Sequence, residues 1–154
     1  MTSASSAQRS RTGSGALSAS QLAVGDSITV VLVDDLTRTQ IVQYAGASGD
    51  FNPLHSDERF ATEVAGYPSI FAHGMLTMGM TATMLTDWVG DGRLTEFGVR
   101  FLNQVWPGDR LTGVAEVTEL RSDDTGNLVD IAVTVTNAAG AKVVTGTATA
   151  RIDP

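Results

Sequence analysis

One segment, GMLTMGMTATMLTDWV at residues 74–89, is apolar around the whole circumference of a helix. Four of the five methionines fall within it, together with two leucines and a tryptophan, and these side chains do not keep to one face. A helix that is apolar all round is a buried helix. Gly79, Ala82 and several threonines lie between the large side chains, where they allow other backbone to approach closely. We therefore predict a long buried helix over Gly74–Val89, around which the remaining chain must wrap.

The hydrophobic period changes after this segment. Residues 94–105, 111–120, 128–137 and 142–152 are predicted strands, and the third alternates strictly between apolar and polar side chains. Short turn sequences separate these strands, and short links favour an antiparallel meander. A β-branched run at Ser27–Val33 predicts one strand before the helix. Together, these strands and the helix predict a single α+β domain, in which an antiparallel sheet wraps around the long buried helix.

Two short helices are predicted between the first strand and the buried helix. Thr37 and Gln40 have the spacing of a capping box, in which two side chains pair with the backbone where a helix begins. The glycines at residues 46–49 should end that helix. A second helix should begin at residues 56–57 and run to about Val64.

Composition excludes several classes of function. With 154 residues the chain fits one domain, and 42% hydrophobic residues are enough for a core. A net charge of −7 argues against nucleic acid or an anionic membrane as the main partner. The absence of cysteine excludes disulfides, thiolate zinc sites and a cysteine nucleophile.

The first 20 residues, MTSASSAQRSRTGSGALSAS, are rich in Ser, Ala and Gly and contain one large apolar residue, Leu17, after the initial Met. They lack the apolar core of a signal peptide, and residues 1–20 are predicted to be a disordered tail. The apolar residues 75–89 are too short to span a bilayer and include Asp87. We therefore expect a soluble cytoplasmic protein with no membrane partner.

The stretch SGDFNPLHSD at residues 48–57 places an acid, an amide, a proline and a histidine within six residues. In a continuous helix Asp50 and His55 would point about 140° apart. Pro53 keeps Asn52 out of the α region, and a bend there can bring both side chains to one side. A carboxylate can orient an imidazole, and together they can hold a water. Alternatively, Asp50 or Asn52 only caps the next helix and His55 is a surface residue; the local sequence leaves both interpretations open.

His73 and Gly74 add a second element. Gly74 opens the buried helix, and a helix N-terminus offers unpaired backbone N–H groups and the positive end of the helix dipole. These groups suit a carbonyl oxygen that gains negative charge. With Asp50 and His55 they predict acid–base chemistry on a carbonyl substrate. His73 itself is predicted to be a structural neighbour, and the methionines to be core residues, some of which could line an apolar acyl channel.

Two segments, YAGASGDFNPLHSD at residues 44–57 and GYPSIFAHGMLTMGM at residues 66–80, resemble the MaoC-like, (R)-specific enoyl-thioester hydratase family of the hot dog fold. The closest resemblance is to the catalytic subunit of actinobacterial (3R)-hydroxyacyl dehydratases. VRFLNQVWPGDRL at residues 99–111 matches that family more loosely, and Gln104 stands where many members carry an apolar residue or proline. The resemblance extends over about residues 21–152.

The resemblance implies a hot dog domain at residues 21–152 with Asp50 and His55 as its catalytic dyad. It implies that the backbone N–H of Gly74 binds the thioester carbonyl and that the amide of Asn52 supports the loop. It also implies an acyl thioester substrate on CoA or acyl carrier protein, no metal and no redox cofactor. The partner would be an identical chain or a second hot dog subunit.

Three functions compete on this basis. The leading one is a hydro-lyase that hydrates trans-2-enoyl thioesters reversibly to (3R)-hydroxyacyl thioesters in fatty-acid metabolism. The second is a hot dog thioesterase, an enzyme that usually works with a carboxylate but without this Asp-x-Asn-Pro-x-His pattern. The third is a non-catalytic subunit that stabilises another hot dog chain, and such a subunit would not need Asp50 and His55. Acyl chain length, physiological direction and which of the two residues takes the proton stay open.

Overall fold

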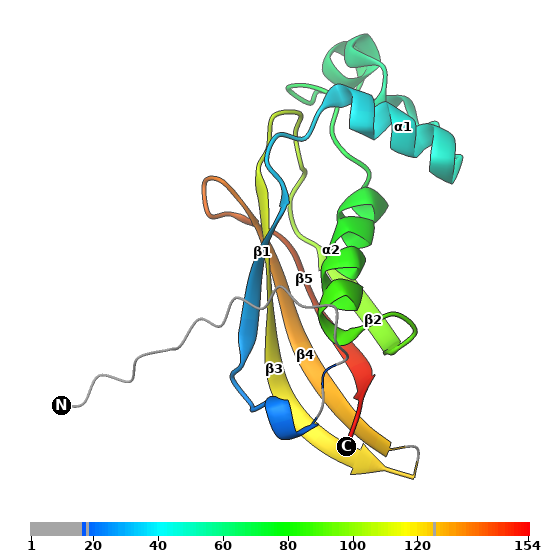
Figure 1. The fold of residues 1–154 in the computed structure, drawn as a ribbon. Coiled ribbons are helices and arrows are strands. Elements are labelled where there is room, and N and C mark those ends of the chain that lie inside the picture. The colour runs from blue at the N-terminus through cyan, green and yellow to red at the C-terminus, as the bar shows by residue number, and fades with distance from the viewer. Residues whose placement is uncertain (1–16, 18, 125) are drawn as a thin grey trace, which may run out of the picture.

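In the computed structural model, which describes residue 17 and residues 19–124 and 126–154, a five-stranded antiparallel sheet curves along one side of a long helix (Figure 1). The elements in chain order are η1 Ala19–Gln21, β1 Ser27–Val33, α1 Arg38–Ser48, η2 Pro53–His55, η3 Phe60–Val64, α2 Gly74–Val89, β2 Leu94–Phe101, β3 Leu111–Asp123, β4 Gly126–Asn137 and β5 Lys142–Ile152. Figure 1 shows α1 and the turns after it at one end of the sheet, beyond the N-terminal end of α2.

The sheet has the strand order β1-β3-β4-β5-β2, and each neighbouring pair is antiparallel. β3, β4 and β5 form the predicted meander. The prediction is wrong for β2, which pairs with β5 and not with β3. The reason is that residues 102–110 do not turn back tightly. Their backbone instead bonds to other segments, as in the bonds from Ala72 N to Val105 O and from Gly108 N to Leu36 O, each 2.8 Å long.

The predicted bounds of β1, α2 and β5 are confirmed, whereas β2 ends four residues earlier than residue 105. The capping box of α1 is also confirmed, because the Thr37 hydroxyl accepts from Gln40 N and the Gln40 side chain accepts from Thr37 N. The second short helix is present as η3, a single π-helical turn at Phe60–Val64. No helix among the described residues is long and apolar enough to cross a bilayer.

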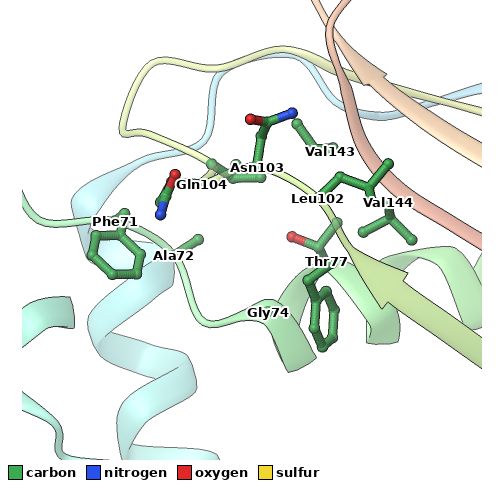
Figure 2. Close-up of a pocket in the computed structure, with 11 residues that line it drawn as sticks. Phe71, Ala72, Gly74, Thr77, Leu102, Asn103, Gln104, Val143 and Val144 are labelled. Carbon is green, nitrogen blue, oxygen red and sulfur yellow. The ribbon is translucent and has the colours of Figure 1, made fainter.

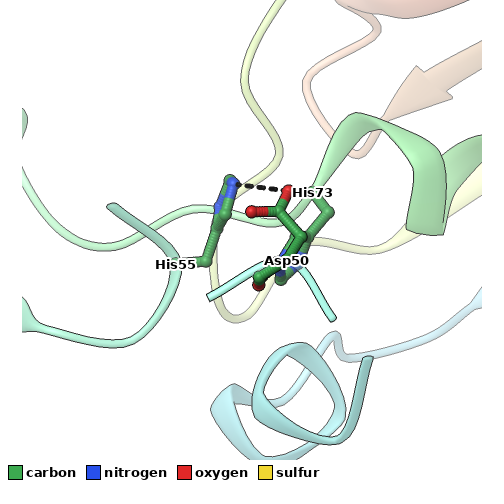
Figure 3. A group of neighbouring side chains, drawn as sticks. All are labelled: Asp50, His55 and His73. Carbon is green, nitrogen blue, oxygen red and sulfur yellow. Dashed lines mark hydrogen bonds and ion pairs between the residues drawn. The ribbon is translucent and has the colours of Figure 1, made fainter. Parts of the chain in front are cut away.

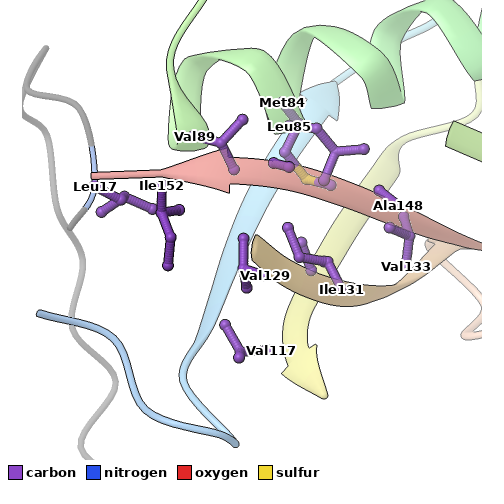
Figure 4. Close-up of a cluster of buried hydrophobic side chains, with 12 residues drawn as sticks. Leu17, Met84, Leu85, Val89, Val117, Val129, Ile131, Val133, Ala148 and Ile152 are labelled. Carbon is purple, nitrogen blue, oxygen red and sulfur yellow. The ribbon is translucent and has the colours of Figure 1, made fainter. Parts of the chain in front are cut away.

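One face of α2 carries the core. Met84, Leu85 and Val89 pack with inward-facing residues of the sheet (Figure 4), among them Val117, Val129, Ile131, Val133 and Ala148. The opposite face is open, since Met75, Gly79, Thr83 and Asp87 are exposed at a spacing of four. The prediction that α2 is buried on all sides is therefore wrong for a single chain, because one sheet covers only one face of a helix.

Leu17 belongs to the same buried cluster, next to Ile152 (Figure 4). It is 4% exposed, and its carbonyl accepts a hydrogen bond from Asp153 N at 3.0 Å. Residues 1–16 and 18, which make up most of the predicted tail, lie outside the described residues. The expectation of a tail therefore stays a prediction for them, and we move the expected start of the packed domain from residue 21 to Leu17.

Leu17→Ala should lower the free energy of unfolding by about 2 kcal/mol, because it removes a buried side chain next to the last strand. In a chain of this size that is roughly 4–8 °C in Tm. Deletion of residues 1–15 should leave Tm unchanged. Thermal unfolding followed by circular dichroism measures both, and equal melting of Leu17→Ala and wild type would show that Leu17 does not stabilise the domain.

Candidate active site

Asp50 follows α1 directly, and the end of that helix fixes its position. Gly49 has φ 76°, the left-handed conformation that favours glycine, and its N–H donates to Ala45 O at 2.9 Å. The next amide, Asp50 N, donates to the hydroxyl of Ser48 at 3.2 Å. The chain therefore leaves the helix in one direction, with the Asp50 carboxylate at the start of the loop.

The predicted bend at Asn52 and Pro53 is present. Asn52 is extended, with φ −56° and ψ 125°, as expected before proline. Its side-chain oxygen accepts from Leu54 N at 3.0 Å, and its N–H donates to Asp50 Oδ1 at 3.2 Å. Asn52 thus caps η2, the turn that carries His55, and joins that turn to the Asp50 carboxylate.

The alternative interpretation of this loop fits only in part. Asn52 is a cap, but the next helical turn is capped by Asp57, whose Oδ1 accepts from Phe60 N at 3.1 Å. His55 is not a surface residue, since it is 8% exposed. The Asp50 side chain remains open to solvent on one side and faces the imidazole on the other.

The tautomer of His55 follows from its partner. His55 Nδ1 lies 2.7 Å from Phe71 O, and a carbonyl oxygen can only accept, so Nδ1 carries the hydrogen. In the neutral ring, Nε2 therefore presents its lone pair. This atom lies 4.0 Å from Asp50 Oδ2 (Figure 3). The separation is too long for a direct hydrogen bond, but one water or substrate hydroxyl can bond to both groups.

His73 joins this pair. Its ring stacks on the His55 ring with centroids 3.8 Å apart and planes at 30°. Its Nε2–H donates to Asp50 O at 3.0 Å, so that His73 holds the backbone of the loop that carries the carboxylate. Nothing in the local sequence connects residues 23 positions apart, and this contact was not predicted.

Asp50, His55 and His73 also have the spacing of metal ligands. Each offers one ligand atom, and these atoms lie within 4.8 Å of one another. Carbonyl groups hold the second nitrogen of both histidines, an arrangement that would suit metal-bound imidazoles. The expectation of a metal-free site therefore stays a prediction, to be tested below.

The N-terminus of α2 lies beside this cluster. His73 is its N-cap residue and makes no capping hydrogen bond, and no other side chain among the described residues caps this end. Leu76 N–H donates to His73 O at 3.1 Å, whereas the N–H of Gly74, the first residue of the helix, is suited to a ligand oxygen. A Cβ at residue 74 would lie 3.1 Å from the ring of Phe101, a tight contact, so glycine leaves room for this ring.

A cavity of about 250 Å³ opens at this first turn (Figure 2). Its wall is mostly apolar, which suits an acyl chain, and Gln104 contributes to it. Gly74 lines the cavity, whereas Asp50 and His55 do not. Residues 71–74 connect the Asp50–His55 pair to the cavity, because Phe71 O bonds to the His55 imidazole at one end of this segment and Gly74 lines the cavity at the other.

A polar network holds the surrounding segments together. Arg38, in the first turn of α1, forms an ion pair with Glu58 and donates to Ser69 Oγ at 2.9 Å. Glu58 Oε2 also accepts from Ser69 Oγ and from Ile70 N. The network thus joins α1, the turn after His55 and the segment that leads to α2. The hydrogen bond from Arg38 holds the pKa of the Glu58 carboxyl below its usual value of 4.5.

Glu58→Gln should lower Tm, and the difference from wild type should depend on pH. A carboxyl whose pKa is lowered by folding stabilises the protein above its unfolded pKa and loses that contribution as pH falls through the folded value. The Tm difference between Glu58→Gln and wild type should therefore be constant above pH 4.5 and should shrink as the pH falls below that value. Glu63→Gln, which breaks the exposed pair with Arg59, is the control and should change Tm less. A difference that persists at pH 3 would contradict the role of this ion pair.

The structure is a hot dog domain in which a carboxylate and an imidazole lie beside the N-terminus of α2. Residues 20–139 match the model of the MaoC like domain, and the chain belongs to this family of hydratases and dehydratases. Over 90 residues it is 39% identical to 3-hydroxyacyl-thioester dehydratase Y of Mycobacterium tuberculosis, a match that covers 56% of this chain and 31% of that protein. The chain thus spans about a third of that relative.

Solved structures agree with this assignment. The (R)-hydratase from A. caviae involved in PHA biosynthesis has a TM-score of 0.76 at 29% identity, and the match covers 87% of this chain and 99% of that one. A chain of the ChsH1-ChsH2 complex from Mycobacterium tuberculosis has a TM-score of 0.72 at 26% identity, with coverage of 84% and 98%.

Proposed function

We propose that this chain hydrates trans-2-enoyl thioesters reversibly to (3R)-hydroxyacyl thioesters carried by CoA or acyl carrier protein. The observation that carries the proposal is the position of the Asp50 carboxylate, 4.0 Å from Nε2 of His55, whose other ring nitrogen is held by Phe71 O. Membership of the family, and similarity to proteins named hydratase and dehydratase, support this class of reaction.

The proposed mechanism uses one water. Asp50 and His55 hold it and accept its proton as its oxygen bonds to C3 of the enoyl group. Electrons from the C2–C3 double bond move toward the thioester carbonyl, whose oxygen gains negative charge and accepts from Gly74 N–H. The proton then bonds to C2 from the same face, so that the addition is syn and the dyad returns to its starting state.

We further propose that the active form is a dimer, either with an identical chain or with a second hot dog subunit. Phe51, Met75, Phe101 and Leu102 are large apolar residues around the site that one chain leaves exposed. β1 and β2 are the sheet edges, and an unpaired edge can accept another strand. A chain of the ChsH1-ChsH2 complex is among the structural relatives, which supports a partner-dependent subunit as the alternative.

Asp50→Asn and His55→Ala should each lower kcat by about 10²–10⁴-fold, because each removes a group that handles the water. Substrate binding should be largely retained. The double variant should be little worse than the poorer single variant, because both residues act on one water. Loss of enoyl absorbance on incubation with enoyl-CoA measures hydration, and melting curves confirm folding.

Asp57→Asn is the matched control, since it changes an acid of the same loop whose carboxylate caps the next turn. It should change Tm more than kcat. If Asp50→Asn and His55→Ala both keep wild-type activity, the loop is only a capping turn. Activity should also survive dialysis against EDTA; its loss, with recovery on adding a divalent cation, would show that the three-residue cluster holds a metal.

Mass in solution and activity should change together. Light scattering at assay concentration should give at least a dimer for the active species, alone or with a second hot dog subunit. An active and strictly monomeric species would contradict the proposed assembly.

A further inference from the structure

Thr77 is a buried polar residue for which the mechanism above has no use. It is 1% exposed, and its hydroxyl has no hydrogen-bond partner among the residues that the structure describes. It nevertheless lines the cavity at the start of α2. Figure 2 shows its oxygen directed into the space that the lining side chains surround.

The other threonines of α2 behave differently. Thr81 donates to Thr77 O at 2.7 Å, Thr83 to Gly79 O at 3.2 Å and Thr86 to Thr83 O at 3.1 Å. These are the usual bonds of a helical threonine, to a carbonyl in the preceding turn. A buried hydroxyl without a partner destabilises the fold, and such a group calls for an explanation.

The position of Thr77 offers an explanation for its unpaired hydroxyl. It lies three residues after Gly74, and residues three apart share one face of a helix. Gly74 and Thr77 both line the cavity, and the Gly74 N–H and the Thr77 hydroxyl are both donors. An oxygen atom bound at this end of the cavity can receive both hydrogen bonds.

We infer that the Thr77 hydroxyl donates a second hydrogen bond to the thioester carbonyl oxygen, alongside the N–H of Gly74. The inference rests on the proposed hydratase function. The carbonyl oxygen becomes more negative as water adds to C3, and a hydrogen bond to a charged acceptor is stronger than one to a neutral acceptor. Thr77 thus stabilises the transition state more than the bound substrate, and its hydroxyl is satisfied only when substrate is present.

Thr77→Val tests this, because valine keeps the shape and removes the hydroxyl. It should lower kcat for an enoyl-CoA by at least 10-fold and by up to about 10²–10³-fold, the loss that follows removal of one oxyanion donor. KM should change little. Its Tm should equal or exceed that of wild type, since an unsatisfied group is lost. Thr77→Ser should keep kcat within a few-fold.

Thr81→Val is the matched control, because it removes a buried hydroxyl one turn away that already has a partner. It should keep kcat within a few-fold of wild type. A second readout needs no turnover: in an Asp50→Asn background, the infrared carbonyl stretch of bound enoyl-CoA labelled with ¹³C at C1 should shift to higher frequency when Thr77→Val is added. Thr81→Val should not shift it.

Equal kcat and equal carbonyl frequency in Thr77→Val and Thr81→Val would overturn the inference and make Thr77 a core residue only. That outcome, obtained with an active wild type, leaves the proposed function intact. A wild-type protein that does not hydrate enoyl thioesters would contradict the proposed function, and the inference would be overturned with it.

Discussion

The packing of α2 against the sheet is the constraint on which the site depends. Leu85 and Val89 are completely buried between this helix and the strands, so the helix has one position and one rotation. That rotation turns Gly74 and Thr77 toward the cavity and leaves Met75 on the exposed side. The orientation of the donors at the first turn is therefore set by apolar contacts several turns further along the chain.

Backbone carbonyls complete the arrangement. Phe71 O fixes the tautomer of His55, and Asp50 O is held by His73. Neither bond occupies the nitrogen or the carboxylate oxygens that face the gap between Asp50 and His55. The structure thus orients the imidazole through a main-chain group and leaves His55 Nε2 and Asp50 Oδ2 facing each other. The Arg38–Glu58 pair adds a second connection between the segments that carry these residues.

The sequence was informative where local chemistry decides the structure. The apolar run at Gly74–Val89, the capping box at Thr37 and the bend before Pro53 depend on neighbouring residues, and all three were predicted. The pairing of β2 with β5, the exposed face of α2 and the contact of His73 with the Asp50 loop depend on segments far apart in the chain. No spacing reveals them. Thr77 gave no signal either, because only the structure tells a bonded threonine from an unbonded one in an apolar helix.

We propose that the site adds one water across a double bond on one face. The most direct measurement is the product formed from a trans-2-enoyl-CoA in D₂O, analysed by chiral chromatography and NMR. We expect a (3R)-hydroxyacyl thioester with deuterium at C2 on the same face as the new hydroxyl. Release of free thiol without hydration, a (3S) product or anti addition would contradict it.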